Sequence, residues 1–349
     1  MEMEQVPYYE EIKITGGDFK AENPEPKATT EHFKILEAAG ERVMIEFGIT
    51  ELILKIREQN YQTLFFMDKS GRPFAWILKK AWSQLYPKEK SPEIKFINRP
   101  DNFRTVTDGD LEVFRSVFHN QVKGKVCLVD ELSLSGSTYD NAEALIRSLP
   151  KQKDSVIDRF DVMQIFPSWY GEWSEEYTGV REKQLLPSPT GRSFNQHGER
   201  ATVGQPTFIS DKSQVAERQK KLRAELDVLA KRLVDHFNDI AEIVSSPIDT
   251  QDLCTNLTKA GIAFSLDYYG TPLISQEELE NTIKRFTPLK TGEKKILIYI
   301  YGAVRKHNLQ FLGSESGFSD LSWNLNESFE KLSAYIEKEL LLSNHLLTN

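Results

Sequence analysis

The sequence predicts an α/β protein with a parallel β-sheet at its core, and three observations support this fold class. Two short apolar runs, residues 63–67 and 126–129, are typical of strands buried on both faces. A turn of small and polar residues follows each run. Behind each turn, apolar residues recur at helical spacing, within 74–85 and 142–149. The repeated order of strand, turn and helix predicts loops at the carboxyl ends of parallel strands.

Three further elements of this unit follow from the same periodicities. Residues 93–99 and 159–166 each contain apolar side chains that alternate or lie together, which predicts two further core strands. Residues 108–118 carry four apolar side chains at helical spacing and predict a helix between those strands. The sheet is therefore expected to contain at least four strands.

The remaining helices flank this unit. Residues 29–60 predict two helices, with a break near Gly40 or at 48–50. Residues 213–245 predict one long amphipathic helix, because its apolar side chains step by three and four positions. Nearer the C-terminus, helices are expected at 250–259, 277–286 and 326–342.

The composition limits the classes of protein to which the chain can belong. Its 349 residues are 39% hydrophobic and 28% charged, which is ordinary for a globular protein. No stretch approaches the roughly 18 unbroken apolar residues of a membrane span. Residues 1–11 are acidic and lack the apolar centre of a secretory signal. Two cysteines make no disulfide framework, and a net charge of −8 argues against broad nucleic-acid affinity. We therefore expect a cytoplasmic protein without membrane or nucleic-acid partners.

The stretch after the second apolar run has the residues of a phosphate site. Asp130 and Glu131 end the strand, where carboxylates can hold hydroxyls or a divalent cation. A loop of small residues follows and leads into a helix, so that backbone N–H groups and the helix N-terminus converge on one point. The loop residues are Ser133, Leu134, Ser135, Gly136, Ser137 and Thr138.

Asp130, Glu131 and residues 135–138 together resemble the motif that binds 5-phosphoribosyl 1-diphosphate (PRPP) in type I phosphoribosyltransferases. The resemblance implies transfer of a 5-phosphoribosyl group from PRPP to a nitrogen nucleophile, with release of pyrophosphate. It implies that the loop binds the 5-phosphate and that Asp130 and Glu131 are catalytic, holding Mg²⁺ directly or through ribose hydroxyls or water. Some members carry an Asp at the third variable position; here it is Leu134, so no general base is assigned.

A second turn after the first apolar run fits the same resemblance. Within that family, the loop following the first core strand binds the pyrophosphate group. Here it supplies two cations, a hydroxyl and a flexible backbone, which suit a diphosphate leaving group. The residues are Asp68, Lys69, Ser70, Gly71 and Arg72, and Pro73 suits the first turn of the next helix. The alternative is a surface turn with solvated charges.

The resemblance also organises the chain into parts. We expect an N-terminal extension (1–27), a parallel-sheet type I phosphoribosyltransferase-like domain (28–185), a loop or linker (186–213), the long amphipathic helix (214–246) and a mostly helical C-terminal region (247–349) of unknown role. The segment 186–213 is either a lid or a linker. As a lid, it would offer Arg192, His197 and Arg200 as ligands. A homodimer is left open.

Two alternatives remain open at this point. Trp169, Tyr170 and Trp173 either stack on the acceptor base, as aromatic residues of this region do in the family, or pack structurally. The function is either phosphoribosyl transfer, for a role in nucleotide metabolism, or non-catalytic sensing of PRPP or a nucleotide on the same fold. A structural role with a vestigial site is a third reading. Titration with PRPP, followed by a search for released pyrophosphate, separates all three.

Overall fold

The computed structural model of the chain describes residues 33, 36, 39–67, 71–97, 106–118, 121–130, 137–162, 212–245, 249–266, 270–286, 296, 299–304, 310–312 and 330–338. The chain divides into two compact units. Unit 1 comprises Met1–His32, Leu52–Val162 and Arg200–Val228, and unit 2 comprises Phe33–Glu51, Met163–Glu199 and Leu229–Asn349. Two helices, α1 (Ala39–Gln59) and α8 (Lys212–Asp235), contribute residues to both units.

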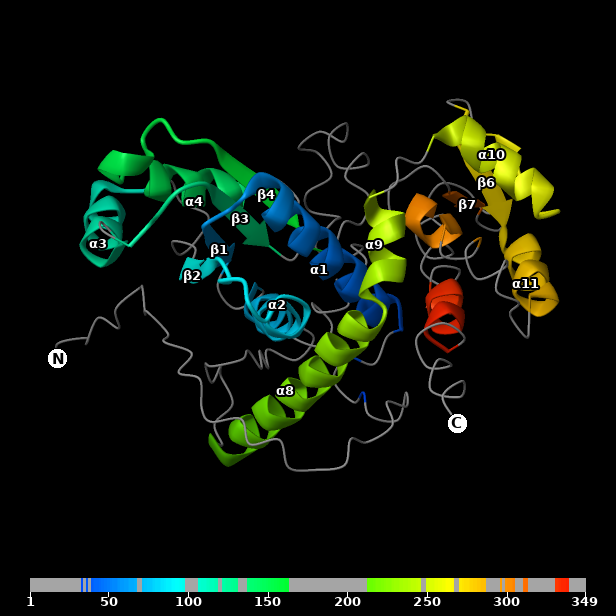
Figure 1. Cartoon of the computed structure of the whole chain (residues 1–349), viewed down its shortest axis with the longest axis horizontal. Coiled ribbons are helices and arrows are strands. Elements are labelled where there is room, and N and C mark those ends of the chain that lie inside the picture. The colour runs from blue at the N-terminus through cyan, green and yellow to red at the C-terminus, as the bar shows by residue number, and fades with distance from the viewer. Residues whose placement is uncertain are drawn as a thin grey trace. The chain divides into compact units, whose positions relative to one another are not determined.

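Unit 1 is built on a four-stranded, entirely parallel sheet in the order β2-β1-β3-β4 (Figure 1). Its strands are β1 (Thr63–Met67), β2 (Glu93–Ile97), β3 (Val126–Asp130) and β4 (Ile157–Asp161). All five residues of β1 and of β3 are buried, as expected for central strands covered on both faces. The predicted α/β class with a parallel sheet is therefore confirmed. The fourth strand begins two residues earlier than expected and ends at Asp161.

Helices cover both faces of this sheet, because successive side chains of a strand point to opposite faces. Phe65 and Leu128 point towards α3 (Asp108–Phe118) and α4 (Ser137–Arg147), in one continuous cluster of buried side chains. Phe66 points to the opposite face, where it contacts the start of α2 (Gly71–Leu85). The last part of α1 lies on that face too, with Lys55 over the ring of Phe160 (5.4 Å).

The strand order creates a switch point between β1 and β3. From β1 the chain passes through α2 to β2 on one side, then returns across β1 to β3 and continues outward to β4. The chain therefore leaves the adjacent strands β1 and β3 towards opposite sides of the sheet. In open parallel sheets, ligands bind in the crevice at such a point.

Unit 2 combines helices with a small three-stranded sheet, β5-β6-β7, which the sequence analysis did not predict. In this sheet β6 pairs antiparallel with β5 and parallel with β7. Helices are also present in 299–304 and 330–338. The other elements of unit 2 include α9 (Phe237–Ser245), α10 (Thr250–Lys259), β5 (Ser265–Leu266), β6 (Pro272–Ser275), α11 (Gln276–Arg285) and β7 (Gln310–Leu312).

The predicted helices of this region agree with α10 and, within one residue, with α11. The sequence marks both starts clearly. The side chain of Asp249 accepts from the backbone N–H of Gln251 (2.6 Å), and that of Ser275 accepts from Glu278 (3.1 Å). These are N-cap contacts, which satisfy N–H groups that have no partner inside the helix.

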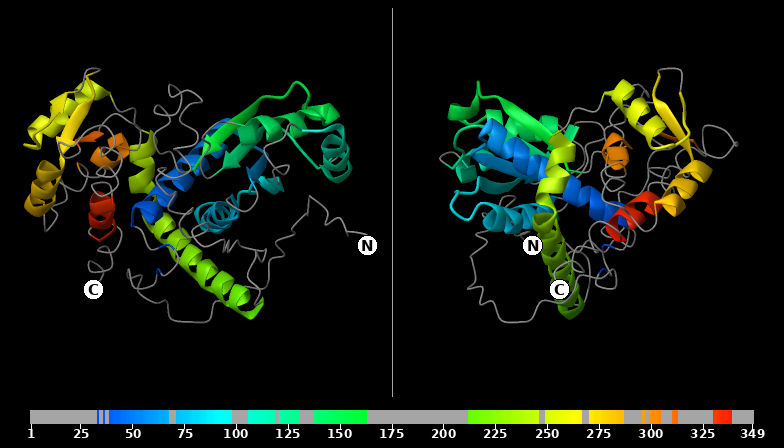
Figure 2. Two further views of the ribbon diagram at one scale, coloured as in Figure 1. Left: turned by 180° about the vertical axis from the view of Figure 1, so that it is seen from behind. Right: turned by 45° about the vertical axis from the view of Figure 1, so that its right-hand side comes forward.

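Two expectations about helices need correction. Of the two alternative breaks, the one at 48–50 is wrong, since α1 is continuous from Ala39 to Gln59, whereas the one near Gly40 lies beside the start of α1. Residues 39–50 are all buried, and this packing outweighs the penalty of about 1 kcal/mol for an internal glycine. The second correction concerns residues 213–245, which were predicted to form a single helix. They form two helices, α8 and α9, with a turn at His236 between them (Figure 2). None of the described helices is long and apolar enough to cross a membrane.

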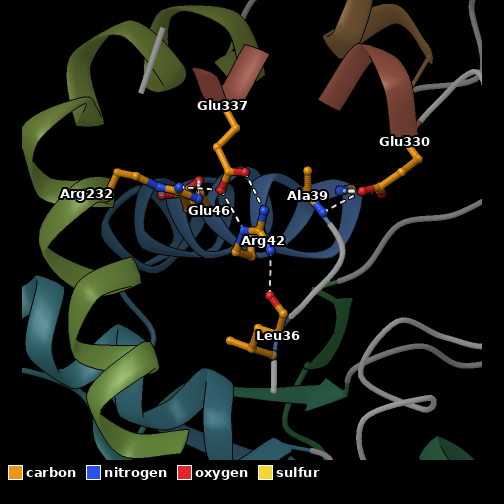
Figure 3. Close-up of polar contacts among 8 residues, drawn as sticks. Leu36, Ala39, Arg42, Glu46, Arg232, Glu330 and Glu337 are labelled. Atoms are coloured by element: carbon orange, nitrogen blue, oxygen red, sulfur yellow. Dashed lines mark hydrogen bonds and ion pairs between the residues drawn. The ribbon is translucent and has the colours of Figure 1, made fainter. Parts of the chain in front are cut away.

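Unit 2 also holds a buried network of two arginines and two glutamates (Figure 3). Arg232 donates to Glu46 from Nε (2.5 Å) and Nη2 (2.8 Å), and to Glu337 from Nη1 (2.5 Å). Arg42 donates to both carboxylate oxygens of Glu337 and, from Nη1, to the carbonyl oxygen of Leu36 (2.6 Å). No residue of the network is more than 4% exposed. Each charge therefore depends on its partners rather than on water.

The pH dependence of stability should reveal the raised pKa of the Glu46 carboxyl group. Burial raises the pKa of Glu46 from 4.5 to about 7, because desolvation outweighs the attraction of Arg232. The folded chain then holds the proton more tightly than the unfolded chain does. The resulting stabilisation is complete below pH 4.5 and is lost as the pH rises through about 7, a change of about 3 kcal/mol.

We expect the difference in unfolding free energy between the wild type and Glu46→Gln to change by this amount across that pH window, in urea denaturation followed by circular dichroism. Glu337 does not obscure the result. Although burial alone would raise the pKa of Glu337, Arg42 and Arg232 lower it, so Glu337 titrates below the window. A difference that does not vary with pH would contradict the shifted ionisation of Glu46.

Candidate functional site

The sequence analysis predicted two phosphate-binding stretches, residues 68–72 and 131–138, which we call the phosphate-type stretches. They follow adjacent strands at one edge of the sheet. β1 and β3 are paired in parallel, with Phe66 opposite Val129, so their carboxyl ends lie side by side. The helix after β1 begins at Gly71, and the helix after β3 begins at Ser137. Both turns therefore start from the switch point, and a helix N-terminus follows each of them (Figure 1).

The residues predicted after β3 are only partly described. Asp130 is the last residue of the strand and is 7% exposed. Ser137 is the first residue of α4, and Thr138 behind it is half-buried. The other predicted residues of this stretch, Glu131, Ser133, Leu134, Ser135 and Gly136, lie outside the described residues. Their roles stay predictions.

The structure corrects the prediction for two of the residues after β1. Gly71 and Arg72 do not lie in a loop, because they form the first turn of α2 and are both buried. The guanidinium of Arg72 lies over the ring of Phe96, 4.9 Å from its centre. Arg72 is therefore a packed side chain as well as a cation, and its part in binding diphosphate stays a prediction. Asp68, Lys69 and Ser70 lie outside the described residues, as do Trp169, Tyr170, Trp173, Arg192, His197 and Arg200.

Gly71→Ala should destabilise the protein by about 1–3 kcal/mol. A Cβ at this position would lie 2.8 Å from the Cβ of Phe66, and Phe66 is fully buried in a central strand. Gly109→Ala in α3 is the matched control, because the nearest atom there is the Thr107 hydroxyl at 3.8 Å. Alanine favours helix over glycine by up to about 1 kcal/mol, so this control should be neutral or stabilising. Equal effects of the two changes in thermal unfolding would contradict a packing requirement at Gly71.

Sequence reasoning missed two residues of this edge, Asp161 and Tyr139. Asp161 ends β4 and is the register partner of Asp130. The hydroxyl of Tyr139, in the first turns of α4, has two acceptors within reach of its single proton, the carboxylate of Asp161 (2.6 Å) and the carbonyl oxygen of Phe160 (2.8 Å). The signal for Asp161 was a carboxylate directly after an apolar strand residue, but the predicted strand ran past it to residue 166.

Burial and the neighbouring carboxylates keep the Tyr139 hydroxyl protonated. Burial raises the pKa of Tyr139 well above its ordinary value, and the negative charges of Asp161 and Asp130 raise it further. Tyr139 therefore stays protonated and keeps orienting Asp161. Nearby in β3, burial raises the pKa of the Cys127 thiol to about 12, so this cysteine is no nucleophile at neutral pH.

Two carboxylates at adjacent strand ends suit one kind of Mg²⁺ site, in which water and substrate complete the coordination. Within the described residues, no group of three His, Cys, Asp or Glu side chains is placed to hold a metal ion. Mg²⁺ often binds one or two carboxylates and completes its shell with water and substrate phosphates. Asp130 and Asp161 fit this pattern, but they do not form a metal site complete without substrate.

The chain was compared with models of known protein families, with curated proteins and with solved structures. None of the three comparisons found a match. The candidate site therefore rests on the sequence motifs, the sheet topology and the geometry described above.

Proposed function

We propose that unit 1 is a phosphoribosyltransferase that binds PRPP and Mg²⁺ and transfers the 5-phosphoribosyl group to a nitrogen nucleophile. The observation that carries the proposal is the position of the two phosphate-type stretches. They are far apart in the sequence, yet they leave adjacent parallel strands at the switch point of the sheet. One ligand with a phosphate at one end and a diphosphate at the other would use both.

Each part of the edge has a distinct task in this proposal. The residues 135–138 and the start of α4 hold the 5-phosphate, which fixes the ribose through binding energy remote from the reacting carbon. The turn 68–70 and the start of α2 hold the diphosphate. Asp130, with a buried carboxylate, faces the ribose side and stabilises the positive charge that develops on the ring.

The divalent cation supplies positive charge against the diphosphate oxygens. On the protein side, Asp130 would hold the cation together with Glu131, which the sequence predicts as a ligand. Asp161 would join them, because it is the register partner of Asp130. The tyrosine hydroxyl that donates to Asp161 keeps that carboxylate oriented.

The decisive experiment is calorimetric titration of the full chain with PRPP at fixed Mg²⁺, followed by an assay for pyrophosphate with a panel of nitrogenous bases. Binding with turnover supports the transferase. Binding without turnover would replace it by a PRPP sensor on the same fold, which Leu134 in place of an acid leaves open. Failure to bind PRPP at all would contradict both.

A matched pair of glycine variants tests the loop assignment. Gly136→Val should abolish PRPP binding, because a β-branched side chain obstructs the approach of a phosphate to backbone N–H groups. Gly109→Val, on the exposed side of α3, should leave binding unchanged, since the site around Gly109 is open. Both variants are checked for folding by circular dichroism. Unchanged affinity in folded Gly136→Val would contradict phosphate binding by residues 135–138.

A further inference from the structure

Unit 1 has a cavity of about 630 Å³ at the amino ends of β3 and β4, the edge opposite the candidate active site. It is lined by the segment before β3, including Lys123 and Lys125, and by the segment before β4, including Lys151, Gln152 and Val156. Val126 and Ile157, the first residues of the two strands, are register partners, so the two segments lie side by side. A volume of this size suits a ligand larger than a single phosphate group.

The cavity concentrates positive charge on a chain whose net charge is −8. Lys125 is paired with Asp158 at 3.4 Å and donates to the side chain of Gln59 at 2.6 Å. Lys123 and Lys151 form no ion pair with any carboxylate among the described residues. Two ammonium groups without an ion-pair partner in the described part of the chain, one from each wall of the cavity, attract an anion of at least two charges.

Backbone hydrogen bonds hold both walls in place before any ligand arrives. The N–H of Lys123 donates to the Thr63 hydroxyl (3.2 Å), which itself donates to the carbonyl oxygen of Lys123 (2.9 Å). Gly124 adopts a φ of +60°, and an added Cβ would lie 2.2 Å from the side chain of Gln62. Across the cavity, the N–H of Ser155 donates to the carbonyl oxygen of Gln152 (3.2 Å). Such preorganisation lowers the entropy that binding costs.

Two further features point to the kind of anion. Gln152 is 3% exposed, and its Oε1 accepts no hydrogen bond from a described residue. A buried amide oxygen without a donor is unfavourable, and rotation of the Gln152 amide towards the cavity that it lines would let a ligand N–H or O–H group satisfy that oxygen. Val156, by contrast, is 64% exposed and offers an apolar surface at the same cavity.

We propose that this cavity binds a nucleotide, with its phosphates on Lys123 and Lys151 and its base or sugar against Val156 and the amide of Gln152. Inorganic phosphate would use the lysines alone. The site is separate from the candidate PRPP site, because it lies at the other end of the same parallel strands.

The test is calorimetric titration of the full chain with ATP and with GTP, without Mg²⁺ and at fixed ionic strength. At least one of the two nucleotides should bind. The double variant Lys123→Gln/Lys151→Gln should weaken that binding by about tenfold or more, because it removes two charge-assisted contacts. Lys88→Gln/Lys90→Gln is the matched control, since both lysines are exposed and outside the cavity. It should leave the affinity within about twofold.

A second variant distinguishes a nucleotide from a bare polyanion. Gln152→Leu should weaken nucleotide binding by about three- to tenfold while leaving the thermal stability of the free protein unchanged or higher, since its Oε1 has no described donor. Inorganic tripolyphosphate should bind more weakly than the nucleotide and should not respond to Gln152→Leu. Tripolyphosphate binding as tightly as the nucleotide would overturn the assignment in favour of a non-specific cationic patch.

The outcome is independent of the proposed transferase. Gly136→Val should retain nucleotide binding, and the lysine double variant should retain PRPP binding. The proposal is overturned if neither nucleotide binds at millimolar concentration, if the lysine variant binds like the wild type, or if Gly136→Val removes nucleotide and PRPP binding together.

Discussion

Glu337→Ala should destabilise the protein by about 3–5 kcal/mol. The Glu337 carboxylate accepts from both Arg42 and Arg232, and these guanidinium groups are no more than 4% exposed. Its removal leaves two buried positive charges, with Glu46 as the one remaining carboxylate of the network. Unfolding in urea, followed by circular dichroism, measures the loss. Glu277→Ala, an exposed position on α11, is the matched control and should stay within about 1 kcal/mol.

A combined replacement shows whether the loss comes from unpaired charge. Arg42→Met, Glu46→Leu, Arg232→Met and Glu337→Leu together remove every charge of the network and keep apolar side chains of similar volume. Replacement of a whole buried ion network is often neutral or stabilising, so this variant should recover most of the stability that Glu337→Ala loses. If Glu337→Ala alone costs less than about 1 kcal/mol, the arginines reach water by rearrangement and the network is not a closed one.

Asp130→Asn should lower kcat/KM for phosphoribosyl transfer by about a hundredfold or more, if unit 1 acts as proposed. The change keeps the size of the side chain and removes its negative charge. Because Asp130 is 7% exposed, that charge acts in a medium of low polarity, where its effect on a positively charged ribose is large. The Mg²⁺-dependent affinity for PRPP should fall as well.

Asp158→Asn is the matched control on the same sheet. Asp158 lies near the amino end of β4, where it accepts from the Tyr61 hydroxyl and pairs with Lys125. Its replacement should affect stability but leave the kinetics of the folded enzyme unchanged. Normal turnover in folded Asp130→Asn would assign Asp130 a structural task at the strand end. Equal kinetic losses in both variants would mean that any charge change in the sheet disturbs activity.

Much of unit 1 follows from local sequence patterns. The runs at 63–67 and 126–129 were predicted to be strands because a strand buried on both faces needs apolar side chains in unbroken succession. The helices α2 and α3 follow from periodic apolar residues. The two phosphate-type stretches were recognised for the same reason, since their chemistry is local to a few consecutive residues.

Contacts between distant segments were beyond such patterns. Arg72 was assigned to a loop, but the ring of Phe96 on the neighbouring strand covers it. A helix break was expected near Gly40 or at 48–50, but residues 48–50 are buried inside α1. Asp161 was not singled out because only the pairing of β4 with β3 brings it beside Asp130.

By itself, the sequence determined which segments of unit 1 are strands and helices and which turns carry phosphate-type residues. Only the tertiary structure decided the strand order, the cavity at the amino edge and the buried ion network, in which Arg232 and Glu46 are 186 positions apart. The physical reason is that backbone periodicity depends on near neighbours in the chain. Burial and charge pairing depend on side chains that folding brings together from remote positions.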